Sequence, residues 1–223
     1  MYTTSSDLEL VYDSSVQTVG IRFTNVKVPK GATIVNAYLQ FKVDKATSGT
    51  VNLKIQGQAS PNPSAFSSQR YNISSRPRTL SFVNWAPPSW TKVGAAGPEQ
   101  ATPNLAPVIQ EIINQSNWAP GNSVVIIITG NAAKRVAEAY EGDRSGAPLL
   151  YISFNTGVAS PSVTPTSTST ATPTATLALP SQTATETPTQ EVIPSETPLP
   201  SETPTLTPEV IPPTDTPEPT PTP

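Results

Sequence analysis

The sequence predicts an all-β domain, an antiparallel, jelly-roll-like β-sandwich with one short helix, followed by a disordered Pro/Thr-rich C-terminal tail. Three observations support this fold class. Short segments in which apolar and polar residues alternate follow one another at the spacing typical of sandwiches. One run of five β-branched residues has the character of a strand buried on both faces. The aromatic residues and glycines stop near residue 157, where Pro and Thr become dominant.

Strands are expected wherever apolar and polar residues alternate. Residues 34–44 give the clearest pattern, because alternate residues from Ala37 to Val43 are apolar and would share one face. Residues 51–58 alternate in the same way after a turn, so we expect these two segments to pair as an antiparallel hairpin. The full set of expected strands is 8–12, 18–23, 34–44, 51–58, 81–85, 123–130, 135–140 and 149–154.

Residues 123–130 are expected to form the central strand. Val124 to Ile128 are all β-branched, and such residues fit the pleated surface of a sheet. The absence of polar alternation predicts that both faces are covered. The run is far too short to cross a bilayer, so we expect no transmembrane segment.

One helix is expected, at residues 104–114, where apolar residues recur at the helical spacing i, i+3, i+4, i+7 and i+8. Asn104 is the expected N-cap residue, because its side-chain oxygen can accept a hydrogen bond from an unpaired N–H of the first turn. Such a helix would cover one open edge or end of the sandwich.

Composition divides the chain into a domain, residues 1–157, and a tail, residues 158–223. All 14 aromatic residues and all 11 glycines lie in the first part. The 66 residues of the tail include 16 Pro, 19 Thr and 7 Ser, and no aromatic residue, Gly, Lys or Arg. Because such a segment cannot bury enough apolar surface to offset its chain entropy, we expect it to be a disordered, extended stalk or linker of the mucin-like kind.

Charge and residue types exclude several function classes. The sequence has no His and no Cys, which removes imidazole bases, thiolate nucleophiles and the usual zinc sites, and we expect no enzymatic activity. The domain has 13 Lys and Arg against 9 Asp and Glu, but these are scattered and form no basic cluster with interleaved aromatic residues. We therefore expect no nucleic-acid partner.

Several runs of the domain resemble a module of secreted bacterial proteins, the DNRLRE and disaggregatase-related β-sandwiches. The runs are 5–10 (SSDLEL), 17–23 (QTVGIRF), 29–41 (PKGATIVNAYLQF), 75–79 (SRPRT), 102–105, 118–130, 135–143 (RVAEAYEGD) and 147–150. The resemblance implies an extracellular or cell-surface location, and some of these modules bind polysaccharides. They usually carry one more strand before residues 5–10, so the resemblance also implies that the domain lacks a first strand and has an open sheet edge.

The first candidate binding feature is a pair of tryptophans. Trp85 and Trp90 flank Pro87 and Pro88, and such a stiff aromatic platform could stack on a sugar ring. Alternatively, both indoles pack over the end of the sandwich as part of the core, as large aromatic residues usually do.

The second candidate feature is the charged stretch that contains Arg135, Glu138 and Asp143. The Arg135 guanidinium could bind a carboxylate of an acidic glycan through two parallel hydrogen bonds. The alternative is an ion pair between Arg135 and Glu138 or Asp143, with no ligand involved.

A structural Ca²⁺ ion is the only cofactor that the sequence suggests. Asp7, Glu9 and Asp13 could supply the carboxylate oxygens that this cation prefers. Their spacing matches no defined calcium loop, and the alternative is that they are solvated acids at a strand edge.

Taken with the resemblance, these features predict a non-catalytic module that binds polysaccharide and is held away from a surface by its stalk. The alternative is a structural subunit for adhesion or filament assembly without a glycan ligand. In that case the open sheet edge at 8–12 would accept a strand from another chain.

Overall fold

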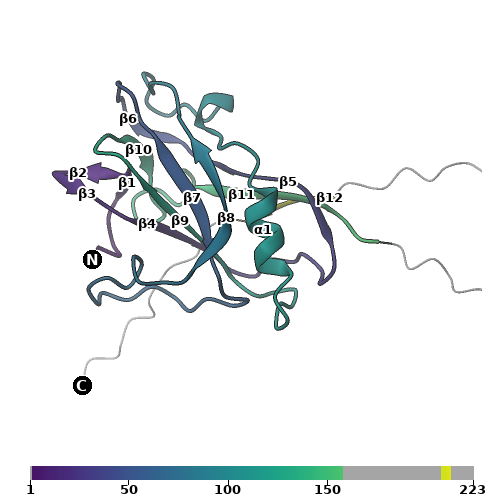
Figure 1. Ribbon diagram of the computed structural model, residues 1–223. Helices are drawn as coiled ribbons and strands as arrows, with labels where there is room; N and C mark the ends of the chain where they lie inside the picture. The colour runs from purple at the N-terminus through teal and green to yellow at the C-terminus, as the bar shows by residue number, and fades with distance from the viewer. Residues whose placement is uncertain (1, 158–206, 212–223) are drawn as a thin grey trace, which may run out of the picture. The chain divides into compact units, whose positions relative to one another are not determined.

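The computed structural model describes residues 2–157 and one further strand, Thr207–Ile211 (Figure 1). The elements in chain order are β1 (Asp7–Leu10), β2 (Tyr12–Asp13), β3 (Ser15–Val16), β4 (Val19–Phe23), β5 (Thr33–Gln40), β6 (Val43–Lys45), β7 (Leu53–Gln58), β8 (Arg78–Trp85), a 3₁₀ turn at Pro98–Gln100, α1 (Ala106–Ile113), β9 (Val124–Gly130), β10 (Arg135–Glu138), β11 (Leu149–Asn155) and β12 (Thr207–Ile211). Every strand pair is antiparallel. The prediction of an all-β, sandwich-like domain with one short α-helix is confirmed.

The strands form one four-stranded sheet and two three-stranded sheets, besides the small hairpin β2–β3. The four-stranded sheet has the order β4-β9-β7-β8, and the others have the orders β1-β10-β6 and β12-β11-β5. Strands β5 and β6 follow one another closely, so the two smaller sheets are joined through this segment. The hydrophobic core lies between them and the four-stranded sheet.

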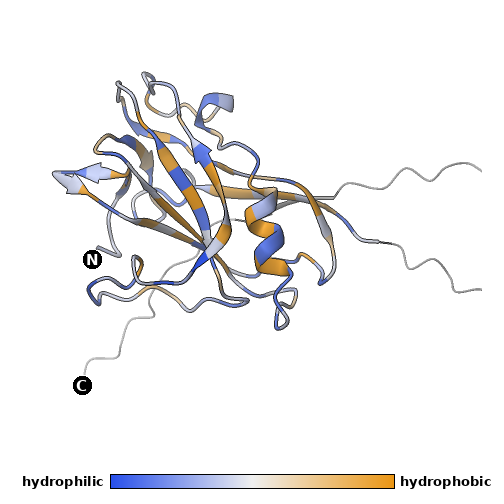
Figure 2. Cartoon of the chain, viewed as in Figure 1, coloured by the Kyte–Doolittle hydropathy of each residue, from blue (hydrophilic) through white to orange (hydrophobic). Residues whose placement is uncertain are grey.

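Strand β9 is the central strand that the sequence predicts. It lies between β4 and β7, and all five residues from Val124 to Ile128 are buried. Its neighbour β7 alternates between hydrophobic and hydrophilic residues along its length (Figure 2). The loop before β8, which contains Phe66, covers β4 on the side of the sheet away from the core. The contact is close, since a Cβ atom added to Gly20 on β4 would lie 2.8 Å from Phe66. This loop explains why β9 is dry on both faces.

The predicted hairpin between residues 34–44 and 51–58 is wrong. Strand β6 pairs with β10, whereas β7 pairs with β8 and β9 in the opposite sheet. The turn between them carries the chain from one layer to the other. Period-two alternation fixes which residues face the core but does not identify the partner strand, since every strand with one wet face shows the same pattern.

The predicted helix is present as α1, two residues shorter at its start and one at its end than expected. It packs against β5, β7 and β8 and so bridges the two layers, whereas the sequence predicted only that it would cover one open edge or end of the sandwich. Its buried residues include Val108, Ile109, Ile112 and Ile113. The Asn104 side-chain oxygen accepts the N–H of Ala106 at 2.8 Å, although Leu105 occupies the N-cap position itself. On its outer side, the Glu111 carboxylate accepts the backbone N–H groups of Leu80 and Ser81 at 2.8 and 2.7 Å, which ties the helix to strand β8.

The predicted tail is described at one place only. Residues 207–211 form β12, which pairs with β11, whereas the sequence predicted disorder throughout residues 158–223. Residues 158–206 and 212–223 lie outside the described residues. Within the described part of the chain, no helix is long and apolar enough to cross a membrane.

Candidate functional site

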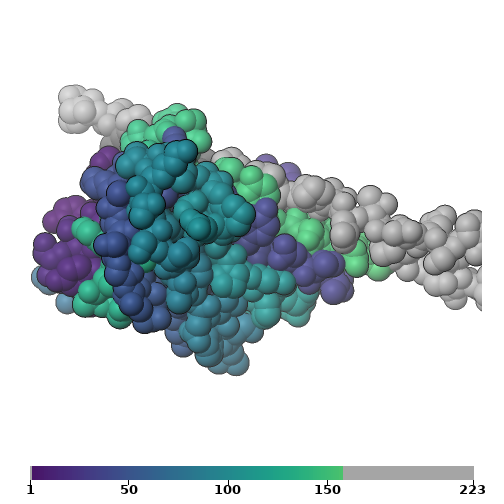
Figure 3. All heavy atoms as spheres, turned by 90° about the horizontal axis from the view of Figure 1, so that it is seen from above, coloured from purple at the N-terminus to yellow at the C-terminus, as the bar shows by residue number. Residues whose placement is uncertain are grey.

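The two tryptophans of the predicted stacking platform are buried. Trp90 is 0% exposed and Trp85 is 6% exposed. Phe41 stacks on Trp85 with ring centroids 5.7 Å apart and lies 6.2 Å from Trp90. The Trp90 Nε1–H donates to the carbonyl of Glu99 at 3.2 Å. The platform prediction is therefore wrong and the core alternative holds, because three aromatic rings exclude water from one another at this end of the sandwich. Figure 3 looks down on this end, and the blue-green middle of the chain covers much of it.

Arg135 is also buried, at 1% exposed, and does not reach solvent. Its guanidinium donates to five backbone carbonyls at 2.7 to 3.4 Å, those of Ser48, Gly49, Pro87, Pro88 and Lys134. Burial lowers the pKa of this group. Both sequence-based interpretations of Arg135 are corrected: it contacts neither a glycan-binding surface nor, among the described residues, a carboxylate. It fastens the turn after β6 to the Pro87–Pro88 loop.

Glu138 and Asp143 form contacts that do not involve Arg135. The N–H of Glu138 donates to the carbonyl of Lys42 at 2.9 Å, and Glu138 lies opposite Asp7 in the ladder of β1 and β10. The Asp143 carboxylate binds Ser145 and the Lys42 ammonium, the latter at 2.9 Å. These contacts lower the pKa of Asp143 to about 2. Asp143 thus ties its turn to the segment between β5 and β6.

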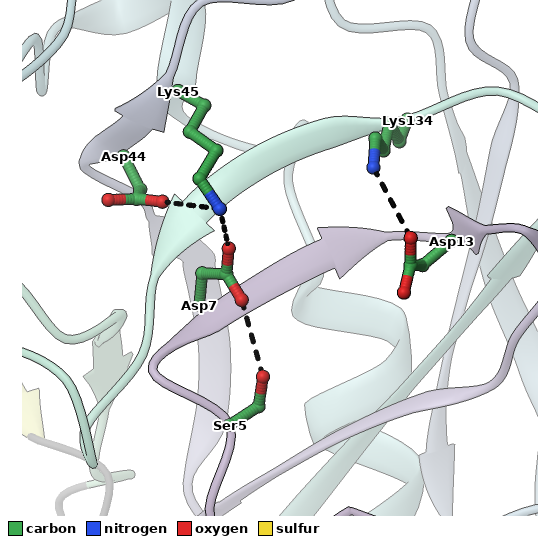
Figure 4. A network of polar contacts seen from close by, with 6 residues as sticks. All are labelled: Ser5, Asp7, Asp13, Asp44, Lys45 and Lys134. Atoms are coloured by element: carbon green, nitrogen blue, oxygen red, sulfur yellow. Dashed lines mark hydrogen bonds and ion pairs between the residues drawn. The ribbon is translucent and has the colours of Figure 1, made fainter.

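Two of the three suggested calcium ligands, Asp7 and Asp13, have other partners (Figure 4). The Asp7 carboxylate binds Lys45 and accepts the Ser5 hydroxyl at 3.2 Å, and Asp13 lies 3.7 Å from the ammonium group of Lys134. Within residues 2–157, no group of three or more acidic side chains is placed to hold a metal ion. The structure does not bring Asp7, Glu9 and Asp13 together as a coordination shell.

A different surface has the form of a binding site. An open hollow of about 590 Å³ lies over the ends of β7, β8 and β9, and we call it the Asn84 hollow. Its lining consists of Asn52, Leu53, Lys54, Asn84, Trp85, Ala86, Thr129 and Gly130. Gly130 is required in the floor, because a Cβ atom there would lie 2.4 Å from the carbonyl oxygen of Asn52. Trp85 is among the lining residues, whereas Trp90 is not.

The strand register arranges the polar groups of the hollow in a row. Lys54 on β7 lies directly opposite Asn84 on β8 and Thr129 on β9. Side chains directly opposite one another in a sheet share a face and lie about 5 Å apart. Within the described part of the chain, the Asn84 amide and the Thr129 hydroxyl have no hydrogen-bond partner. The row therefore presents an amide, an ammonium group and a hydroxyl to whatever enters from solvent.

An aromatic ring borders this row. Phe82 is 49% exposed and lies two residues before Asn84 on the same face of β8. The Lys54 ammonium group lies 4.0 Å from the centroid of its ring. Phe82 was not among the predicted site residues. In the structure Leu80, Phe82 and Asn84 are exposed and alternate along β8 with less exposed residues. An apolar residue at two of these three positions made the outer face look like an inner one.

A half-exposed aromatic ring beside a row of neutral and cationic hydrogen-bonding groups suits a ligand that has both apolar C–H faces and many hydroxyls. No carboxylate is among the residues that line the hollow. Comparisons with protein-family models, curated proteins and solved structures found no match to this chain.

Proposed function

We propose that this chain is a non-catalytic, extracellular or cell-surface module with a jelly-roll-like fold that binds polysaccharide at the Asn84 hollow. The observation that carries the proposal is the row of Thr129, Lys54 and Asn84 with the exposed Phe82 ring beside it. The resemblance to DNRLRE and disaggregatase-related modules supports the same function. The proposed site differs from the one that the sequence predicted. Trp90 and Arg135 are buried and take no part in it, and of the predicted residues only Trp85 lines the Asn84 hollow.

Binding at such a site would be weak for a single module. One stacking contact and a few hydrogen bonds correspond to a dissociation constant on the order of 10⁻⁴ to 10⁻³ M, or about −4 to −5.5 kcal/mol. A Thr/Pro-rich spacer that presents several modules at one surface would raise the overall strength through avidity. The spacer and the weak site therefore support the same proposal, a module that acts while attached to a surface.

Affinity electrophoresis of the full chain in gels that contain neutral or acidic polysaccharides tests the proposal. We expect retardation in at least one gel, and we expect Asn84→Ala combined with Thr129→Ala to abolish it. Leu80→Ala is the matched control, because Leu80 is 90% exposed on the same strand but does not line the hollow. Normal mobility of the unchanged chain in every polysaccharide would remove the function. Retardation that persists in the double variant would remove the site.

A structural role in adhesion or assembly is the second candidate, and one observation favours it. Strand β1 is the outer strand of the β1-β10-β6 sheet, as the edge hypothesis for residues 8–12 requires. Self-association of the purified chain that disappears when Glu9→Pro is introduced into β1 would support this role. A monomer at high concentration would contradict it.

A further inference from the structure

The edge of strand β11 is occupied by a segment of the chain's own tail, strand β12. The pattern of this pairing shows which tail sequences can occupy the edge. Strand β12 pairs with β11 over five residue pairs, from Leu150 opposite Ile211 to Phe154 opposite Thr207. The tail segment therefore adds a strand to an existing sheet. In this mode of recognition main-chain hydrogen bonds provide most of the affinity.

The direction of the main-chain groups follows from strand β5. The backbone groups of Ala37 and Leu39 are hydrogen-bonded to the segment before α1. The Thr102 N–H donates to the carbonyl of Leu39, and the Leu105 N–H donates to the carbonyl of Ala37. Successive residues of a strand point their N–H and C=O groups in opposite directions, so the main-chain groups of Tyr38 point toward β11. Its partner Tyr151 faces β5, and the flanking residues Leu150 and Ile152 present their groups to β12.

The same alternation assigns the residues of β12. Glu209 and Ile211 lie opposite Ile152 and Leu150, so their N–H groups point toward β11. Pro208 and Val210 lie opposite Ser153 and Tyr151, and their main-chain groups point away. Pro208, which has no N–H, therefore sits where none is needed, as prolines in edge strands do. This edge therefore needs N–H groups at the Thr, Glu and Ile positions of the docked strand and needs none at the Pro position.

The tail contains a second segment that satisfies this rule. Residues 207–212 read TPEVIP and residues 189–194 read TQEVIP, so five of six positions are identical. The one difference places Gln190 where Pro208 stands, at the outward-pointing position. We propose that residues 189–193 are an alternative occupant of the β11 edge, so that the tail docks in two registers 18 residues apart.

Chain length permits both registers, and their relative weight follows from two opposing effects. The segment from Gly157 to the docked strand has 49 intervening residues when 207 begins the strand and 31 when 189 begins it. Closing the shorter loop is favoured by about twofold. Pro208 acts in the opposite direction, because it holds the preceding residue extended before docking. Docking of 189–193 would shift the point at which the tail leaves the domain by about 56 Å of extended chain.

Engineered disulfides test this proposal, since the chain has no native cysteine. Ser153→Cys combined with Pro208→Cys reports the register of β12, and Ser153→Cys combined with Gln190→Cys reports the second register. Residues directly opposite in antiparallel strands have the Cα separation that a disulfide needs. We expect both full-length pairs, oxidised at low protein concentration, to form intramolecular links at least about tenfold faster than Ser153→Cys with Ser201→Cys, which lies outside both segments.

A proline exchange shows whether the two segments compete. Glu209→Pro removes an N–H that faces β11, so it should increase the yield of the 153–190 link several-fold. Val210→Pro is the matched control, because that N–H points away, and it should leave the yield unchanged. A 153–190 yield equal to that of the 153–201 control overturns the second register. Links found only between different molecules would assign the occupant to a second copy and overturn the proposal in its intramolecular form.

Discussion

The ammonium group of Lys54 lies 4.0 Å from the centroid of the Phe82 ring, across two neighbouring strands on the outer face of the four-stranded sheet. A cation over an aromatic face is attracted to the electron-rich ring. Phe82 nevertheless stays 49% exposed, two residues before Asn84 on the same face of β8. This pair gives the proposed site both an apolar surface and a positive charge.

Replacing Phe82 should weaken polysaccharide binding without unfolding the domain. Loss of an aromatic stacking partner removes about 0.5–1.5 kcal/mol, which corresponds to roughly a threefold to tenfold weaker affinity for Phe82→Ala. Phe82→Tyr keeps the ring and should retain binding. Retardation in polysaccharide gels measures the affinity, and circular dichroism confirms the fold. Equal retardation of the Ala and Tyr variants would show that the ring does not touch the ligand.

Lys54 should decide between acidic and neutral ligands. Lys54→Gln keeps a hydrogen-bonding side chain but removes the charge, so we expect it to reduce binding to an acidic polysaccharide and to spare a neutral one. Binding to the acidic ligand should also decrease with added salt, because exposed charges are screened. A salt-independent interaction that survives Lys54→Gln would exclude an electrostatic role for this residue.

Trp90 should affect stability and not ligand recognition. Trp90→Ala removes a fully buried indole that contacts Phe41 and Trp85, and we expect a loss of about 3–5 kcal/mol in the free energy of unfolding. Trp90→Phe should lose less, since much of the volume is kept. Urea denaturation followed by the remaining tryptophan fluorescence measures both. A midpoint for Trp90→Ala equal to that of the unchanged chain would contradict the buried position.

Arg135 should likewise behave as a structural residue. Arg135→Leu leaves up to five carbonyls without their charged donor, and we expect a loss of roughly 3–5 kcal/mol. Arg135→Lys should rescue only part of it, because an ammonium group cannot reproduce the planar fork. The exposed Arg144→Leu is the control and should change the unfolding midpoint little. Similar midpoints for the Leu variants at positions 135 and 144 would refute this role.

Asp143 gives the domain a predictable acid response. Its hydrogen bonds to Ser145 and Lys42 lower the pKa from 3.8 to about 2 in the folded state. A carboxyl whose pKa is lower when folded stabilises the protein above the unfolded pKa, and this stabilisation is lost as the pH falls toward the folded value. The melting temperature of Asp143→Asn should therefore lie below that of the unchanged chain at neutral pH and converge with it as the pH falls from 3.8 to about 2.

Glu9 provides the control of opposite sign for that experiment. Burial, and then the neighbouring charge of Asp7, raises the pKa of Glu9, so its ionised form destabilises the fold. Glu9→Gln should raise the melting temperature at neutral pH, and the gain should disappear at low pH. Parallel curves for Glu9→Gln and Asp143→Asn would show that neither carboxyl has the assigned environment.

Local patterns predicted the elements well and their neighbours poorly. The β-branched run from Val124 to Ile128 identified the central strand, because such residues leave few alternatives to a buried strand. The hairpin prediction failed since alternation does not specify a partner. Trp85 and Arg135 were misplaced for a related reason, since a proline-rich loop and a charged side chain suggest exposure. In the structure Trp85 packs against Phe41 and Trp90, and five backbone carbonyls surround the Arg135 guanidinium. Only the tertiary structure shows which polar atoms the guanidinium can reach.

The contact between Glu111 and β8 has a consequence for how this protein avoids aggregation. Sheets grow into fibrillar ribbons when a row of free N–H groups accepts a foreign strand, and natural proteins usually prevent this with lysines or prolines in the exposed strand itself. At β8 a carboxylate from a neighbouring helix occupies two consecutive N–H groups instead. Because Glu111 already occupies these N–H groups, β8 does not need a charged residue at its exposed positions to prevent pairing with another chain. Leu80 and Phe82 can therefore be exposed to solvent on this strand.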